Sequence, residues 1–155
     1  YVQMREERNN ALLAEQRALA VKDYMVAVFQ GADPEVAGQR DLKVSEVLDA
    51  SRLRLAAMLN EQPTLRTELT GILAGVYHNL GKREQAVGMF EEAIAEERRL
   101  GRPLMLASLL HRKANTLYDA EEFARAEPVA LEALALRERH QPDSTELVDT
   151  LRLLG

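Results

Sequence analysis

The chain has 155 residues, of which 46% are hydrophobic and 29% are charged, so it can bury the core of one ordinary domain and is not a disordered segment. Its formal net charge is −5 and no run of Lys or Arg stands alone, which argues against a surface for nucleic acid or anionic membranes. The absence of cysteine excludes disulfides, thiol catalysis and Cys-ligated zinc.

Helix-forming residues fill long stretches of the chain, and Gly, Pro and Asp interrupt them at regular intervals, so the sequence predicts an all-α fold. Pro63 and Pro103 suit the first turn of a helix, where a missing N–H is tolerated. Gly81 and Gly101 suit the left-handed position that follows a helix. The expected helices span residues 4–30, 41–60, 63–80, 83–100, 103–119, 122–140 and 143–154.

The first predicted helix has two different halves. Residues 5–16 are mostly charged or amide-bearing and fit a solvated stalk, perhaps next to a membrane, better than the short coiled coil that a few heptad-spaced apolar residues suggest. The second half carries an apolar stripe at Ala18, Val21, Met25, Val28 and Phe29. We therefore expect three parts: the N-terminal helix at 1–30, a linker loop with a degenerate capping helix at 31–62, and a repeat region at 63–155.

An internal repeat with a period of 40 residues decides the fold prediction. Its pattern residues in the first copy are Leu73, Ala74, Tyr77, Gly81, Ala86, Phe90 and Ala93. The second copy keeps Ala114, Ala126 and Ala133, with Phe123 as the bulky residue at the turn. This spacing resembles the tetratricopeptide repeat, in which small side chains let two antiparallel helices approach closely. A helical bundle is the alternative, but it gives no reason for these residues to keep one spacing.

The resemblance implies a tetratricopeptide-type solenoid of antiparallel helix pairs, wound as a right-handed superhelix behind a long N-terminal helix. Its units would be 63–102, 103–142 and an incomplete third at 143–155, with the lengthened second helix typical of kinesin-light-chain repeats. Asp143, with Glu146 three residues later, is expected to cap the last helix. That helix lacks its partner, so we expect an exposed apolar stripe there and a homodimer.

The order of segments along residues 10–155 is similar to the region that follows the kinase domain in bacterial serine/threonine protein kinases with tetratricopeptide repeats. The similarity is carried by residues 18–29, 31–35, 42–49, 59–63 and 65–80. It implies a bacterial sensor or scaffold region that binds a protein or peptide. An adaptor or chaperone-like module of a regulator unrelated to a kinase is the alternative.

The same resemblance bears on location. Position 1 is Tyr rather than Met, so we expect a piece of a longer chain. A transmembrane segment outside this piece would place it outside the cytoplasm, whereas a parent without such a segment would be cytoplasmic. Contact with a membrane is expected only through such an outside segment.

We expect no catalytic activity, metal or cofactor in this chain. It has no Gly-rich loop, no His-Arg-Asp run and no Asp-Phe-Gly run, all of which phosphoryl transfer by a kinase needs. His78, His111 and His140 have no second ligand at a zinc-binding spacing. Ser108 lies three residues from His111 but has no acidic residue to orient a hydrolase-type pair.

The expected binding surface is a concave groove lined by residues about one turn apart on the first helix of each pair. Its predicted residues are Glu68, Gly71, Gly75, His78, Asn79, Ser108, His111, Arg112, Asn115, Tyr118, Asp119, Asp149 and Arg152. Part of this set resembles a carboxylate-holding group, although the Lys residues usual in such groups are absent: Asn79, His111, Arg112 and Asn115. We expect largely exposed side chains at His78, Asn79, His111, Asn115 and Tyr118.

Overall fold

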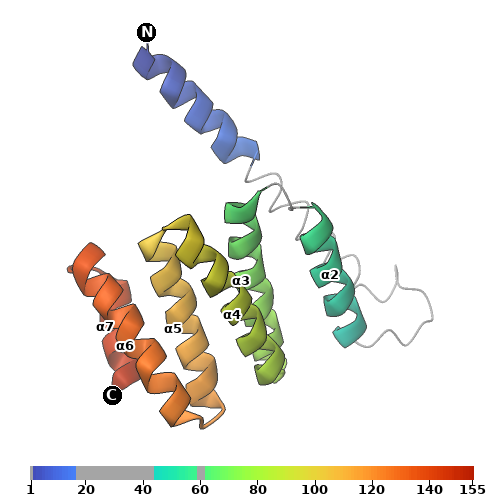
Figure 1. Ribbon diagram of the computed structural model, residues 1–155, viewed down its shortest axis with the longest axis vertical. Coiled ribbons are helices and arrows are strands. Elements are labelled where there is room, and N and C mark those ends of the chain that lie inside the picture. The colour runs from blue at the N-terminus through green and yellow to red at the C-terminus, as the bar shows by residue number, and fades with distance from the viewer. Residues whose placement is uncertain (1, 17–43, 59–61) are drawn as a thin grey trace. The chain divides into compact units, whose positions relative to one another are not determined.

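The computed structural model describes residues 2–16, 44–58 and 62–155, and these are helical apart from short turns (Figure 1). No β-strand occurs in the described part of the chain, so the all-α prediction is confirmed for it. The chain divides into two compact units, Tyr1–Met58 and Leu59–Gly155.

The first unit contains a helix over residues 2–16 and helix α2, Val44–Met58. Every side chain of residues 2–16 is exposed, as the charged composition of this stretch predicts. In α2, Leu48, Ser51 and Leu55 are buried and share one face, because residues three and four apart lie on the same side of a helix. The predicted apolar stripe at 18–29 and the linker loop lie outside the described residues.

The second unit is a row of helices whose bounds recur after 40 residues. Helix α3, Pro63–Asn79, is repeated as α5, Pro103–Asp119, and α4, Arg83–Leu100, is repeated as α6, Phe123–His140. Helix α7, Thr145–Leu154, follows. Each helix packs against the next one along the chain, and α3 also touches α5 (Figure 1). The period of the sequence is therefore also the period of the helices.

The turn inside each pair uses the left-handed conformation. Gly81 has φ 78°, and Gly101, after the end of α4, has φ 70°, as the sequence predicted for both. In the second pair Glu121 stands at the position of Gly81 and has φ 60°. A side chain with a Cβ costs about 1–2 kcal/mol in this conformation. The second pair therefore keeps the turn at an energetic cost that the first pair avoids.

The small residues expected between paired helices are buried. Ala86 and Ala126, predicted to lie where the helices cross, are both 0% exposed. The other buried pattern residues are Leu73, Ala74, Tyr77, Phe90, Ala93, Ala114 and Ala133. Ala130, 40 residues after Phe90, is also fully buried, so the second pair encloses less side-chain volume at this position.

Phe123 does not have the packing role predicted for it. Its side chain is 59% exposed, and its ring centroid lies 6.1 Å from that of Tyr118. Phe123 is the first residue of α6, so it precedes the turn of the helix that faces inward. Ala126 enters the interior instead, and the Phe123 ring covers the outside of the turn against Tyr118.

The last helix begins one residue later than its predicted cap implies. Ser144, not Asp143, is the capping residue, and its hydroxyl accepts a hydrogen bond from the Leu147 N–H at 3.1 Å. The backbone is extended at Ser144, which places that hydroxyl at the right distance before the helix and leaves Asp143 one residue too early. In α7, Val148 and Leu151 are 45% and 48% exposed. The homodimer expected from this stripe stays a prediction.

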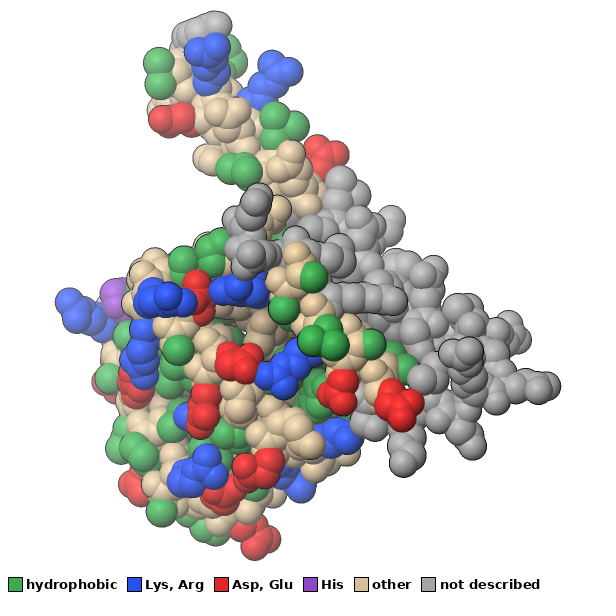
Figure 2. All heavy atoms as spheres, turned by 45° about the vertical axis from the view of Figure 1, so that its right-hand side comes forward, with side chains coloured by type: hydrophobic (Ala, Val, Ile, Leu, Met, Phe, Trp, Pro, Cys, Tyr) green, Lys and Arg blue, Asp and Glu red, His purple; other side chains and the backbone are tan. Residues whose placement is uncertain are grey.

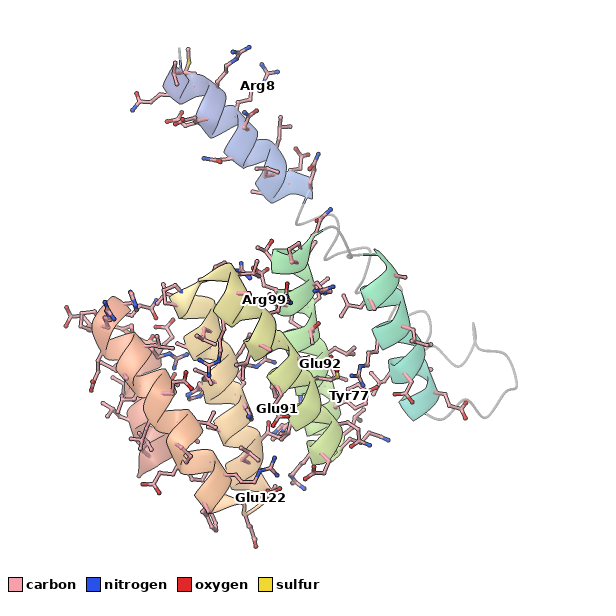
Figure 3. All side chains as sticks on the ribbon, in the orientation of Figure 1. Arg8, Tyr77, Glu91, Glu92, Arg99 and Glu122 are labelled. Carbon is pink, nitrogen blue, oxygen red and sulfur yellow. The ribbon has the colours of Figure 1, made fainter. Side chains whose placement is uncertain are left out.

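Charges of both signs are intermixed on the face that Figure 2 shows, so the described residues there form no broad area of one sign. Ion pairs join neighbouring helices: Arg98 Nη1 lies 2.6 Å from Glu132 Oε1, and Lys113 Nζ lies 3.2 Å from Glu91 Oε1, which is labelled in Figure 3. Exposed pairs of this kind contribute about 0–1 kcal/mol each. They orient the helices but do not drive the packing.

Candidate binding pocket between α3 and α5

Five of the predicted groove side chains come together in one pocket. Its volume is about 270 Å³, below the roughly 300–1,000 Å³ of small-molecule sites, so it suits a group the size of a side chain. Helices α3, α4 and α5 all contribute to its lining, which consists of Gly75, His78, Asn79, Phe90, His111, Arg112, Asn115 and Thr116.

Two glycines open α3 toward α5. Gly71 and Gly75 are one turn apart and leave that side of α3 without Cβ atoms. A Cβ at Gly71 would lie 2.8 Å from Leu109 Cδ2, and a Cβ at Gly75 would collide with the Arg112 guanidinium. The glycines therefore make the space that the Arg112 side chain occupies.

Arg112 is the central cation of the pocket. Its Cζ lies 5.3 Å from the centroid of the Phe90 ring, a cation–π arrangement. The side chain is half-buried, and this burial lowers the pKa of the guanidinium. Among the residues that the structure describes, nothing accepts a hydrogen bond from it or forms an ion pair with it. Arg98 and Arg102, by contrast, both bind carboxylates of neighbouring helices.

His78 is held by a carboxylate from α5. Its Nε2 lies 3.1 Å from Asp119 Oδ2, which fixes the ring with a proton on that nitrogen. Its Nδ1 is buried and has no hydrogen-bond partner in the described part of the chain. Asp119, which lies outside the pocket lining, thus acts on the pocket through His78.

His111 connects the pocket with α7. Its Nδ1 lies 3.2 Å from the Oγ1 of Thr150, a fully buried residue of α7. Burial lowers the pKa of His111, and so do the positive charges of Arg137 and Arg112, while Asp149 raises it in part. The imidazole is therefore neutral near pH 7, and Arg112 carries the formal positive charge of the pocket lining.

The structure places the predicted groove residues in two groups. His78, Asn79, His111, Arg112 and Asn115 line the pocket, as does Gly75. Three others lie outside it: Tyr118 stacks on Phe123, Arg152 pairs with Asp149 at 3.4 Å, and Ser108 is half-buried elsewhere on α5.

The predicted exposure is right for some groove residues and wrong for others. Asn79 and Asn115 are exposed, as expected. His78, His111 and Tyr118 are half-buried, because each ring contacts a group on a neighbouring helix or turn. Their predicted large exposure was wrong.

Two lining residues were not predicted. Phe90 was assigned to packing alone, and Thr116, which is 1% exposed, was not assigned to the groove. An aromatic residue that packs between helices can still present one ring face to a cation, so the aromatic position in the repeat pattern was the available signal for Phe90. No sequence pattern singles out Thr116.

Comparison of the chain with known protein families, with characterised proteins and with solved structures finds no match. None of the described helices is both long and apolar enough to cross a membrane. No three His, Cys, Asp or Glu side chains of the described residues are grouped so that they could hold a metal ion. What the pocket binds therefore has to follow from its own geometry and charge.

Proposed function

We propose that the second unit is a tetratricopeptide-type repeat module that binds a protein or peptide segment across α3 and α5. We further propose that this module is the sensor or scaffold region of a bacterial serine/threonine protein kinase. The observation that carries the binding function is the pocket, in which polar side chains from two successive helix pairs converge. The link to a kinase rests only on the order of sequence segments along residues 10–155.

Three structural features support the tetratricopeptide assignment. The bounds of the helices recur after 40 residues, the turn inside each pair is left-handed, and small residues such as Ala86 and Ala126 are fully buried. A period in sequence together with neighbour-to-neighbour packing is typical of solenoid repeats.

The polar groups of the pocket suit an extended peptide. Asn79 and Asn115 lie on the two helices that flank the pocket, and both side chains are exposed. No item of protein structure in the described residues satisfies their amides, and an amide can donate to a peptide C=O and accept from a peptide N–H at once. A peptide laid across both helices would therefore contact both repeats.

A displayed library of random peptides, selected against the 155-residue chain, tests the binding function. We expect enriched peptides that slow hydrogen exchange of α3 and α5, and whose affinity falls about tenfold or more when Asn79 and Asn115 are both changed to Ala. Arg99→Gln, on the exposed side of α4, is the matched control and should leave affinity unchanged. Failure to enrich any peptide, or binding that the double variant leaves intact, overturns the proposal.

The sequence of the full-length gene tests the kinase part. A kinase domain encoded before Tyr1, with an apolar stretch of about 20 residues between the two, is the expected result. A full-length protein without a kinase domain contradicts it and favours the adaptor or chaperone-like alternative.

A further inference from the structure

We infer that the pocket between α3 and α5 recognises one carboxylate group of its peptide partner, and that Arg112 binds this group. This inference deepens the proposed function and rests on it. It assigns a ligand chemistry to a particular side chain, whereas the proposed function requires only that a peptide binds across the two helices.

The first argument is the missing partner of Arg112. The fold supplies acceptors to its other inward-placed arginines: Arg102 binds the carboxylates of Glu68 and Glu97, and Arg137 binds the Glu146 carbonyl at 2.6 Å. Arg112 is half-buried, yet no described residue accepts a hydrogen bond from its guanidinium. A guanidinium removed from water without an acceptor is unfavourable, and an acceptor from outside the chain would remove that cost.

The second argument is that Arg112 is held in place before anything binds. The Phe90 ring lies on one side of the guanidinium, 5.3 Å from Cζ, and the bare surface of Gly71 and Gly75 lies beside it. Less side-chain freedom remains to be lost on binding, so a fixed guanidinium binds a matching group more tightly than a free one.

The third argument identifies the group as a single carboxylate. Arg112 is the only positive charge in the pocket lining near pH 7, because His111 is neutral there and His78 donates to the Asp119 carboxylate. One charge matches a monoanion, whereas a phosphate dianion would keep a charge unmatched close to Asp119. The planar guanidinium also fits the two oxygens of a carboxylate side by side.

Three small probes separate the sources of such a group. Acetyl-alanyl-glutamyl-alanine amide carries a side-chain carboxylate, acetyl-alanyl-alanine carries a terminal carboxylate, and acetyl-alanyl-glutaminyl-alanine amide is the neutral control. Each is titrated into the 155-residue protein at pH 7 and constant ionic strength, and the Arg112 Nε–H and the Gly71 and Gly75 amides are followed by NMR. Inorganic phosphate is titrated in parallel.

We expect at least one carboxylate probe to give a saturable shift of the Arg112 Nε–H, with an affinity about tenfold or more above that of the glutaminyl probe. Phosphate should bind no more tightly than the carboxylate probe. The carboxylate probe that binds better identifies whether the group comes from a side chain or a chain end. Equal shifts from the glutamyl and glutaminyl probes, or tighter binding of phosphate, would overturn the inference.

Variants test the same point on the protein. Arg112→Gln should abolish the response of the Gly71 and Gly75 amides, and Arg112→Lys, which keeps the charge but loses the planar fork, should weaken binding. Arg99→Gln removes one exposed positive charge and should change nothing. Binding that survives Arg112→Gln in a folded protein contradicts the inference. If Arg112→Gln does not fold, the lysine variant and the glutamyl-to-glutaminyl ratio remain decisive.

The outcome for the carboxylate and the outcome for the proposed function are separable. Selected peptides that shield α3 and α5 but bind equally well without an acidic group would leave the proposed function standing and end the carboxylate inference. Carboxylate probes that bind at Arg112, together with no selected peptide on this face, would do the reverse.

Discussion

Helices α4 and α6 hold opposite charges at one equivalent buried position. That position is Glu97 in α4 and Arg137 in α6, 40 residues later, with exposed fractions of 0% and 6%. Burying a charged group is unfavourable unless polar partners surround it, so each of the two needs its own partners.

Glu97 ties its own pair to the start of the next one. It accepts hydrogen bonds from the Thr67 hydroxyl of α3 and from Arg102, whose Nε lies 3.0 Å from Oε2. Arg102 directly precedes α5 and also donates to Glu68 Oε1 of α3 at 3.0 Å. One carboxylate therefore links α3, α4 and the beginning of α5.

Arg137 ties the second pair to α7 with the opposite charge. Its Nη1 donates to the Glu146 carbonyl at 2.6 Å and to the Thr150 hydroxyl. The comparison teaches that the repeated backbone fixes where a charged group is buried, while the following segment determines its sign. A basic residue follows α4, and carbonyl and hydroxyl oxygens follow α6.

Removing the acidic member should give the largest effect. We expect Glu97→Ala to lower the free energy of unfolding by about 3–5 kcal/mol, because it leaves Arg102 and Thr67 without their shared acceptor. Urea denaturation measures the loss, and Arg99→Ala on the exposed side of the same helix should change it by less than about 0.5 kcal/mol. A loss as small as that of the control would show that Glu97 does not link the helices.

Enlarging the crossing residues compares the two pairs by packing instead of charge. Ala86→Leu and Ala126→Leu should each lower the free energy of unfolding by about 1–3 kcal/mol, since both sites are fully buried and neither has room for a larger side chain. Thermal unfolding of the two variants gives the values. If Ala86→Leu unfolds like the parent, the alignment of the two pairs is wrong.

Removing the hydroxyl that Arg137 binds should loosen α7 alone. Thr150→Val takes an acceptor from Arg137 and the partner from His111 Nδ1, at an expected cost of about 1–3 kcal/mol. Hydrogen exchange should accelerate in α7 and stay unchanged in α3 and α4, because each helix depends mainly on its neighbours. Thr145→Val, at an exposed site of the same helix, is the control. Uniform acceleration along the whole second unit would contradict the local role.

Acid should act on the same contact through His111. Its pKa in the folded chain is lowered, so the unfolded chain, with a pKa near 6.5, takes up the proton first as pH falls. The stabilisation is complete above about pH 6.5 and is lost as pH falls from there through the lowered folded value. Urea denaturation between pH 7.5 and 5 measures it, and His111→Gln should show a shallower decline. Identical declines would remove His111 as the cause.

Exchanging the turn residues should give the smallest effect. Glu121→Gly relieves a left-handed Glu and should raise the free energy of unfolding by about 0.5–1 kcal/mol, whereas Gly81→Glu should lower it by a similar amount. Urea denaturation of the two variants gives opposite signs if the turns are equivalent. Changes of the same sign would show that their strain is not.

The sequence was sufficient for the parts of the fold that depend on local patterns. A period of 40 residues, prolines in the first turns and glycines after the last ones place α3 to α6 within one residue of their bounds. The cap of α7 was misplaced, because Asp143 and Ser144 both suit a cap and only the backbone path decides between them. Phe123 was misplaced because a pattern of residue sizes does not say which turn of α6 faces inward.

The pocket was predicted in part for a related reason. Residues such as His111 and Asn115 share one face of α5 by their spacing, which a sequence reveals. The position of Arg112 over Phe90, and the fit of its side chain against Gly75, depend on how closely α3 and α5 approach. That approach results from packing across the repeats, which the spacing along one helix does not encode.

The neighbour-to-neighbour packing of the second unit gives an occupied pocket an effect on cooperativity. In such a row each repeat can unfold in part by itself, because few contacts reach beyond the next helix. The pocket takes its lining from α3, α4 and α5, so a bound peptide would touch both repeats at once. At a hundred times its dissociation constant it would add about 2.7 kcal/mol to the state in which both are folded. Binding would then turn two loosely coupled repeats into one cooperative unit.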